Sequence, residues 1–276
     1  MKIVVLSDNR KFDASLQSEH GLCVYVETEH YRCLLDTGAS DKFIRNAEKL
    51  GIDISAVDFV FISHGHADHI GGLPAFLELN KKAKIVLSGN AIHQKFFSKR
   101  NEFHSISLDF DFSLFEERFV YVELEMVFRD EIRVFSAKTN KYPLPKANAT
   151  LFKDAGYGIE SDDFNHELLI SFGTDNLFVY TGCAHKGLLN ILGSISLFPT
   201  KRIETVMGGF HLLDSKTEQQ FETKAEIDKI AYELKMKYPQ TNFITGHCTG
   251  EKVYQDLKMY LEERITSFYT GYSIRI

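Results

Sequence analysis

The strongest constraint on this chain is the run HGHADH at residues 64–69, which follows the hydrophobic stretch 59–62 after one serine. Three imidazoles and one carboxylate within six residues are costly to bury without a partner. Neutral imidazole and carboxylate are ligands of zinc and related metals, so the run predicts a metal site at the end of a buried strand. Four ligand-type side chains exceed what one tetrahedral ion with an open position needs from one segment, which indicates two ions. The expected ligands are His64, His66, Asp68 and His69.

A strand-like stretch, a glycine and a histidine recur later in the chain. The three later copies are 177–185, 203–211 and 242–247, and they alternate with segments of helical spacing at 188–197, 221–234 and 253–265. This alternation predicts an α/β fold, taken as a single domain over residues 1–276. Open α/β sheets place ligands at the carboxyl ends of their strands, where glycine permits a sharp turn. We therefore expect the remaining metal ligands at distant strand ends, with His185 and His247 as the best candidates.

Three further residues have both a functional and a structural interpretation. Cys183 precedes His185 by two positions; a thiolate can bind zinc, but a lone buried cysteine is usually inert. His166 is a further candidate ligand. His211 could hydrogen-bond a phosphate or protonate a leaving group, or it could be a structural histidine.

Composition narrows the class of protein. The chain has 276 residues, of which 44% are hydrophobic and 25% charged, as in soluble globular proteins. Its net charge of −6 is spread along the sequence, which argues against a nucleic-acid partner or a membrane surface. Residues 1–6 are too short for a signal-peptide core, and the four cysteines lack paired metal spacing, so reduced thiols in the cytoplasm are expected. The sequence makes no prediction about the oligomeric state.

Residues 96–165 differ from the rest of the chain because phenylalanines crowd their first part. The segment is interpreted either as an insertion that caps the active site or as ordinary core, since aromatic side chains mostly bury. As an insertion, it would determine which substrate is bound.

Several segments together resemble a known family. The run 64–69, LDTG around Asp36 and TGH around His247 resemble motifs of the metallo-β-lactamase superfamily. Within it, the chain resembles the subgroup that includes the dihydropterin-methyl ribofuranosylaminobenzene phosphate synthases. The segments that carry this second resemblance are SDN at 7–9, EHGL at 19–22, TGCAHKG at 181–187, GGFHL at 208–212 and GHCTG at 246–250.

The resemblance implies an αββα sandwich with the site on one edge. It implies that Asp36 supports the metal loop and that His247 is the last ligand. Two departures are present. The usual bridging aspartate appears as Cys183, and the usual third histidine has a counterpart only in His166 or His185.

The leading functional hypothesis is a metal-dependent hydrolase that uses a metal-activated water on a small, phosphate-containing ester. Asp68 would hold the second ion and orient the nucleophile, and His20 and His211 would contact the substrate. Zinc is the default metal, with one or two ions, while manganese and iron suit the same ligands. Two alternatives stay open: a transferase that displaces diphosphate from a pterin-methyl substrate, and a metal-binding sensor without catalysis.

Overall fold

The computed structural model describes residues 1–128, 131–197, 202–214 and 221–276. Contacts along the chain separate two compact units, and each is described by itself. The first contains residues 1–123, 152–160 and 268–276, and the second contains residues 124–151 and 161–267. The single domain over residues 1–276 stays a prediction. None of the helices in the described ranges has the length and apolar composition that crossing a bilayer requires.

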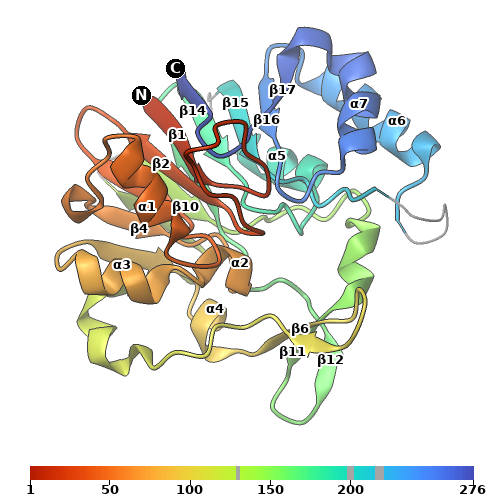
Figure 1. Cartoon of the computed structure of the whole chain (residues 1–276). Coiled ribbons are helices and arrows are strands. Elements are labelled where there is room, and N and C mark those ends of the chain that lie inside the picture. Colours follow the sequence, from red (N-terminus) through yellow and green to blue (C-terminus); the bar gives the residue numbers. More distant parts are fainter. Residues whose placement is uncertain (129–130, 198–201, 215–220) are drawn as a thin grey trace. The chain divides into compact units, whose positions relative to one another are not determined.

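The first unit is built on a seven-stranded sheet with the order β18-β1-β2-β3-β4-β5-β8 (Figure 1). The strands β18, β1, β2 and β3 pair antiparallel, whereas β3, β4, β5 and β8 pair parallel. The parallel strands are short and mostly apolar, as expected for strands buried on both faces. The strands are β1 (Lys2–Ser7), β2 (Cys23–Glu27), β3 (Arg32–Leu35), β4 (Phe59–Phe61), β5 (Lys84–Leu87), β8 (Phe119–Tyr121) and β18 (Ser273–Arg275).

Short helices connect the parallel strands of this unit. Helix α1 packs Phe43 and Ala47 into the first hydrophobic core, and Pro74 lies in the first turn of α3, as the sequence predicts. The helices are α1 (Lys42–Lys49), η1 (Ile54–Ala56), α2 (Ala67–Ile70), α3 (Leu73–Leu79), α4 (Asn90–His93) and η2 (Phe112–Arg118). A four-stranded sheet has the order β12-β11-β6-β7, from β6 (Phe96–Ser98), β7 (His104–Ser105), β11 (Leu151–Asp154) and β12 (Ile159–Ser161).

The second unit is built on another seven-stranded sheet, with the order β17-β16-β15-β14-β13-β10-β9. The strands β14, β15, β16 and β17 are parallel neighbours, and the other half of the sheet is antiparallel. Its strands are β9 (Glu125–Phe128), β10 (Ile132–Phe135), β13 (Leu169–Phe172), β14 (Asn176–Tyr180), β15 (Arg202–Gly208), β16 (Asn242–Thr245) and β17 (Ile265–Ser267). Its helices are η3 (Lys146–Thr150), α5 (Leu188–Ile195), α6 (Lys224–Lys237), α7 (Glu251–Leu261) and η4 (Glu262–Arg264).

Helices α6 and α7 lie side by side in Figure 1 and contribute to the second hydrophobic core. A capping box between Thr223 and Glu226 fixes the start of α6, so Phe221 precedes this helix and is not part of it. The prediction that the last helix extends to Ile265 is wrong. The helix ends at Leu261 because Glu262 adopts a positive φ of 55°, and Ile265 then begins β17.

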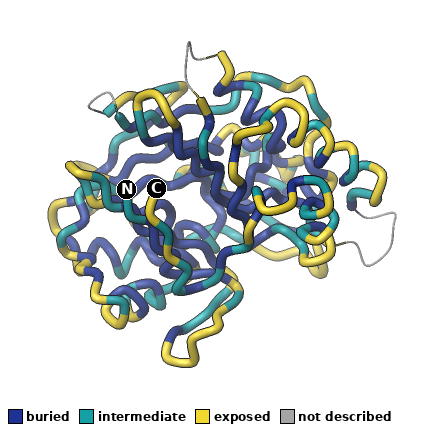
Figure 2. The backbone as a smooth tube through the Cα atoms, turned by 90° about the horizontal axis from the view of Figure 1, so that it is seen from above, coloured by how far each residue is buried: buried dark blue, intermediate teal, exposed yellow. Residues whose placement is uncertain are grey.

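The predicted α/β class is confirmed, while residues 96–165 are more dispersed than one insertion. They supply β8 to the first large sheet, β9 and β10 to the second, and all of the four-stranded sheet. Phe96, Phe112 and Phe119 are buried, so the core interpretation holds for these phenylalanines, whereas Phe103 is exposed. Figure 2 shows long runs of buried residues, with exposed residues mainly at the outer bends of the tube.

Candidate metal centre

The histidine run of the first unit leaves the carboxyl end of β4 and enters α2. His64, His66 and His69 are all buried, and the ring centroids of His64 lie 4.6 Å from His66 and 4.0 Å from His69. Gly65 is required between them, because a Cβ there would lie 2.3 Å from the carbonyl oxygen of Ala91. The chain thus brings three imidazoles of one short loop together.

Asp36 holds this loop in place through hydrogen bonds. Its fully buried carboxylate accepts hydrogen bonds from the amide of Ser63 at 2.7 Å, the hydroxyl of Ser63 at 2.7 Å and Nδ1 of His69 at 2.7 Å. The single proton of the Ser63 hydroxyl goes to Asp36, so this oxygen must accept from Nδ1 of His64, at 2.9 Å. Both His64 and His69 therefore carry their proton on Nδ1, which makes Nε2 the nitrogen that suits a metal.

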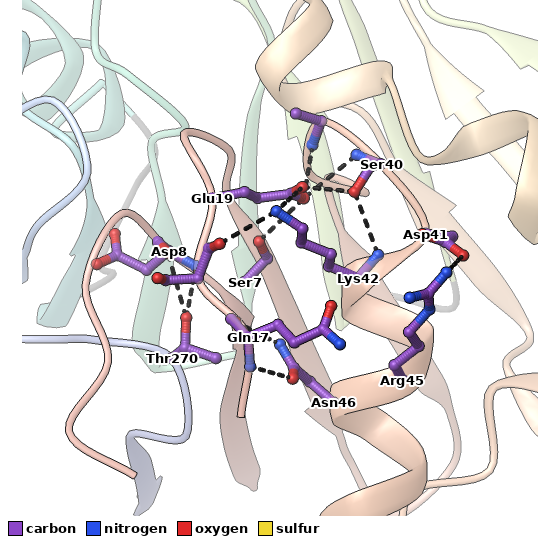
Figure 3. Close-up of polar contacts among 12 residues, drawn as sticks. Ser7, Asp8, Gln17, Glu19, Ser40, Asp41, Lys42, Arg45, Asn46 and Thr270 are labelled. Atoms are coloured by element: carbon purple, nitrogen blue, oxygen red, sulfur yellow. Dashed lines mark hydrogen bonds and ion pairs between the residues drawn. The ribbon is translucent and has the colours of Figure 1, made fainter. Parts of the chain in front are cut away.

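Asp68 and His20 also lie near each other in the first unit. Oδ2 of Asp68 lies 3.8 Å from Nε2 of His69 and 3.3 Å from Nε2 of His20. The carbonyl of Asp68 accepts a hydrogen bond from the amide of Leu22 at 3.0 Å and so holds the segment that carries His20. The carboxylate of Glu19 holds the same segment by accepting from the amide of Ser40. Figure 3 shows Glu19 bonded to Ser40 beside α1. His20, the predicted substrate contact, thus lies near Asp68, a predicted metal ligand.

In the second unit, the recurring histidines follow three adjacent parallel strands. Cys183 and His185 follow β14, His211 follows β15 and His247 follows β16. The strand order therefore brings these carboxyl ends to one edge of the sheet, as the sequence pattern predicts. Non-glycine residues with positive φ mark each turn, at Ala184 (57°), His211 (50°) and His247 (52°), which is a costly conformation typical of functional sites.

His185 is oriented in the same way as His64 and His69. The side-chain amide of Asn148 donates to the carbonyl of His185 at 2.8 Å, and its Oδ1 lies 3.1 Å from Nδ1 of His185. Oδ1 can only accept, so the His185 proton again lies on Nδ1 and Nε2 is the metal-binding atom. Glu167 accepts from the amides of His185 at 2.6 Å and Lys186 at 2.9 Å. Burial raises the pKa of Glu167 to about 7, against the lowering effect of these amides.

His211 and two cysteines gather at the same strand ends. His211 is 3% exposed, and neither ring nitrogen has a hydrogen-bond partner among the described residues. All four cysteines of the chain are buried and form no disulfide. Burial opposes ionisation of Cys248, but the side chains of Cys183, His211 and His247 lower its pKa well below the usual range.

His166, the alternative ligand, is buried with Nε2 at 3.0 Å from Oδ2 of Asp162.

The donor chemistry of both groups fits divalent metal ions. Three buried histidines have their Nδ1 protons fixed by Ser63, Asp36 and Asn148, which is the outer-shell pattern of metal-binding imidazoles. Ser63, Asn148 and Glu167 are not predicted from the sequence, because each acts through contacts that the motifs do not encode. Whether the two groups of donors serve one binuclear centre stays a prediction.

A cavity of about 550 Å³ lies within the second unit. Residues 187–189, which follow His185, and Phe210 and Leu212, which flank His211, form part of its wall, and residues 141–146 form another part. Its volume is that of a small-molecule site. Part of the segment 96–165, which the sequence predicts to determine substrate specificity, thus borders this cavity.

Comparisons with known proteins agree with the fold and the motifs. Residues 18–147 match the family model of the metallo-β-lactamase superfamily. The chain is 27% identical to the 7,8-dihydropterin-6-methyl-4-(β-D-ribofuranosyl)-aminobenzene-5'-phosphate synthase of Methanocaldococcus jannaschii, over 95% of this chain and 91% of that protein. An uncharacterized protein of the same organism, MJ0448, is 24% identical over 76% of this chain and 79% of its own length.

Two solved structures are similar over nearly their whole length. Tm1679, described as a metal-dependent hydrolase of the β-lactamase superfamily, has a TM-score of 0.82 and 29% identity, with 100% of this chain and 99% of that chain covered. A diphosphatase of the PhnP family has a TM-score of 0.54 and 14% identity, with 99% of this chain and 96% of that chain covered, which shows the shared fold.

Proposed function

Because the chain has the metallo-β-lactamase fold and resembles that superfamily in its motifs, we propose that it is a metal-dependent hydrolase of a small, phosphate-containing ester. The observation that carries this proposal is the fixed Nδ1–H tautomer of His64, His69 and His185, since such orientation serves metal binding. The proposed metal ligands are His64, His66, Asp68, His69, His185, His247 and Cys183.

Zinc, manganese or iron bound by these residues would supply a Lewis acid and a water whose pKa is lowered toward neutrality. The chain's own groups supply the remaining functions. Asp68 orients the attacking water as an acceptor, and Asp36 keeps His69 and, through Ser63, His64 in the required tautomer. His211 is proposed to donate a proton to the leaving group or to bind its phosphate, with His20 as a second substrate contact.

The test compares His66→Ala with His104→Ala in the full chain. His66 is buried in the histidine run, whereas His104 is an exposed histidine of the same unit. We expect His66→Ala to fold, to bind less metal and to lose hydrolysis of phosphate mono- and diesters, and His104→Ala to behave as the wild-type protein does. Unchanged turnover by a folded His66→Ala variant would exclude the mechanism.

The similarity to a protein named as a synthase favours a second candidate, a transferase that displaces diphosphate from a pterin-methyl carbon. The same donors would then bind the leaving diphosphate. Incubation with a pterin-methyl diphosphate and a ribosylated aminobenzene distinguishes the two candidates, because only the transferase yields a coupled product. Diphosphate release without coupling would instead support hydrolysis.

A further inference from the structure

Three loops of the second unit that carry predicted ligands are held together by hydrogen bonds of threonine hydroxyls and backbone amides. Thr245 donates to the carbonyl of Gly208 at 2.9 Å and lies 2.7 Å from the hydroxyl of Thr249. Thr249 in turn accepts from the amide of Phe210 at 3.0 Å, and the amide of Gly209 donates to the carbonyl of Gly182 at 2.7 Å. The loops after β14, β15 and β16 are therefore fixed with respect to one another.

This arrangement brings Cys183, His211 and Cys248 together. Their exposures are 3%, 3% and 6%, and one ligand atom from each lies within 4.8 Å of the other two. Atoms bound tetrahedrally to one zinc ion at about 2.3 Å lie roughly 3.8 Å apart, so a small contraction would place all three on one ion.

Two features indicate that the cluster is built for a ligand. Both nitrogens of the buried His211 ring have no hydrogen-bond partner in the described part of the chain, which is costly unless something else binds them. Gly209 also leaves room for the thiol, because a Cβ at this position would lie 2.2 Å from Sγ of Cys248.

We propose that Cys183, His211 and Cys248 form a site for a thiophilic divalent cation of the zinc class. Two sulfurs and one imidazole favour zinc over magnesium or calcium, and three protein ligands leave a fourth position for water or another group. Binding releases the two thiol protons to solvent and forms two metal–sulfur bonds and one metal–nitrogen bond. The site shares Cys183 and His211 with the proposed hydrolase and adds Cys248, so the inference rests on that proposed function and deepens it: His211 binds the ion here and does not contact the leaving group. The site is read out without turnover.

Cobalt(II) titration of the reduced, metal-free full chain tests the proposal, because cobalt replaces zinc and reports thiolate ligands by a near-ultraviolet charge-transfer absorption. We expect this absorption in the wild-type protein and about half of it in Cys248→Ser. Cys23→Ser, which removes a buried thiol of the first unit, is the matched control and should retain the full absorption.

Three results would overturn the proposal: no thiolate absorption in the wild-type protein, the same absorption in Cys248→Ser, or a Cys183–Cys248 disulfide in protein purified under reducing conditions. If Cys248→Ser does not fold, zinc-edge X-ray absorption of the saturated wild-type protein gives an independent answer. Two sulfur ligands on one zinc ion at about 2.3 Å support the site, and one sulfur or none contradicts it, because Cys183 alone would supply a single sulfur. Loss of hydrolysis in His66→Ala tests the proposed function separately.

Discussion

Replacement of Asp36 by asparagine separates the orienting role of this carboxylate from its size. The carboxylate accepts three hydrogen bonds within the first unit, two from Ser63 and one from His69. Asparagine is nearly isosteric and tolerates the positive φ of 59° at this position, so the backbone conformation can persist. Its amide oxygen can still accept from the Ser63 amide, but its NH2 group then faces two donors.

The substitution changes which ring nitrogen of the imidazoles carries the proton. The Nδ1 proton of His69 loses its acceptor, and the ring is stabilised instead by moving that proton to Nε2, which blocks the metal-binding nitrogen. If the Ser63 hydroxyl turns to accept from the new amide, it still cannot restore the acceptor that His69 lost. Leaving one or two buried donors unpaired costs about 2–4 kcal/mol of the free energy of unfolding, and outer-shell changes lower metal affinity about 10–100-fold.

Urea unfolding of the metal-free protein measures the first effect, and zinc competition with a chromophoric chelator measures the second. Asp41→Asn is the control, because Asp41 pairs with Arg45 on the exposed side of α1, and a surface pair contributes about 0–1 kcal/mol. Zinc affinity in Asp36→Asn within a factor of two of the wild-type value would refute the orienting role, even if stability falls.

Three further outcomes follow from buried groups. Asn46→Ala should lower the free energy of unfolding by about 2–4 kcal/mol, because its side chain makes three hydrogen bonds to backbone atoms of Leu6 and Gln17; Figure 3 shows Asn46 beside Gln17. A loss below about 1 kcal/mol in urea unfolding would contradict this. Gly209→Ala should cost about 1–3 kcal/mol and reduce zinc-dependent protection of Cys248 from alkylation, since the new methyl group overlaps its sulfur. Burial raises the pKa of Glu167 to about 7, so the folded metal-free chain binds more protons than the unfolded chain between about pH 4.5 and 7. Its stability should therefore decrease on the order of 3 kcal/mol as pH rises through this range, and Glu167→Gln should flatten that part of a pH series.

Local patterns in the sequence were sufficient for much of the fold. The buried strand before the histidine run, the proline in the first turn of α3 and the histidines after β14, β15 and β16 all lie where the periodicity and the glycines place them. These features depend on neighbours in the chain. The end of α7 does not, because the apolar spacing continues to Ile265 while a positive φ at Glu262, a residue that rarely adopts it, stops the helix.

The candidate ligands were also visible in the sequence, but the groups that determine their protonation were not. A motif identifies an imidazole and not the side of the ring that carries the proton. That depends on Asn148 for His185, 37 positions away, and on Asp36 for His69, 33 positions away. Ser63 is adjacent to His64, yet its role as an acceptor follows only because Asp36 takes its proton. Metal binding by these histidines is therefore predicted to depend on residues outside the metal motif itself, and Asp36→Asn is the substitution that tests this dependence.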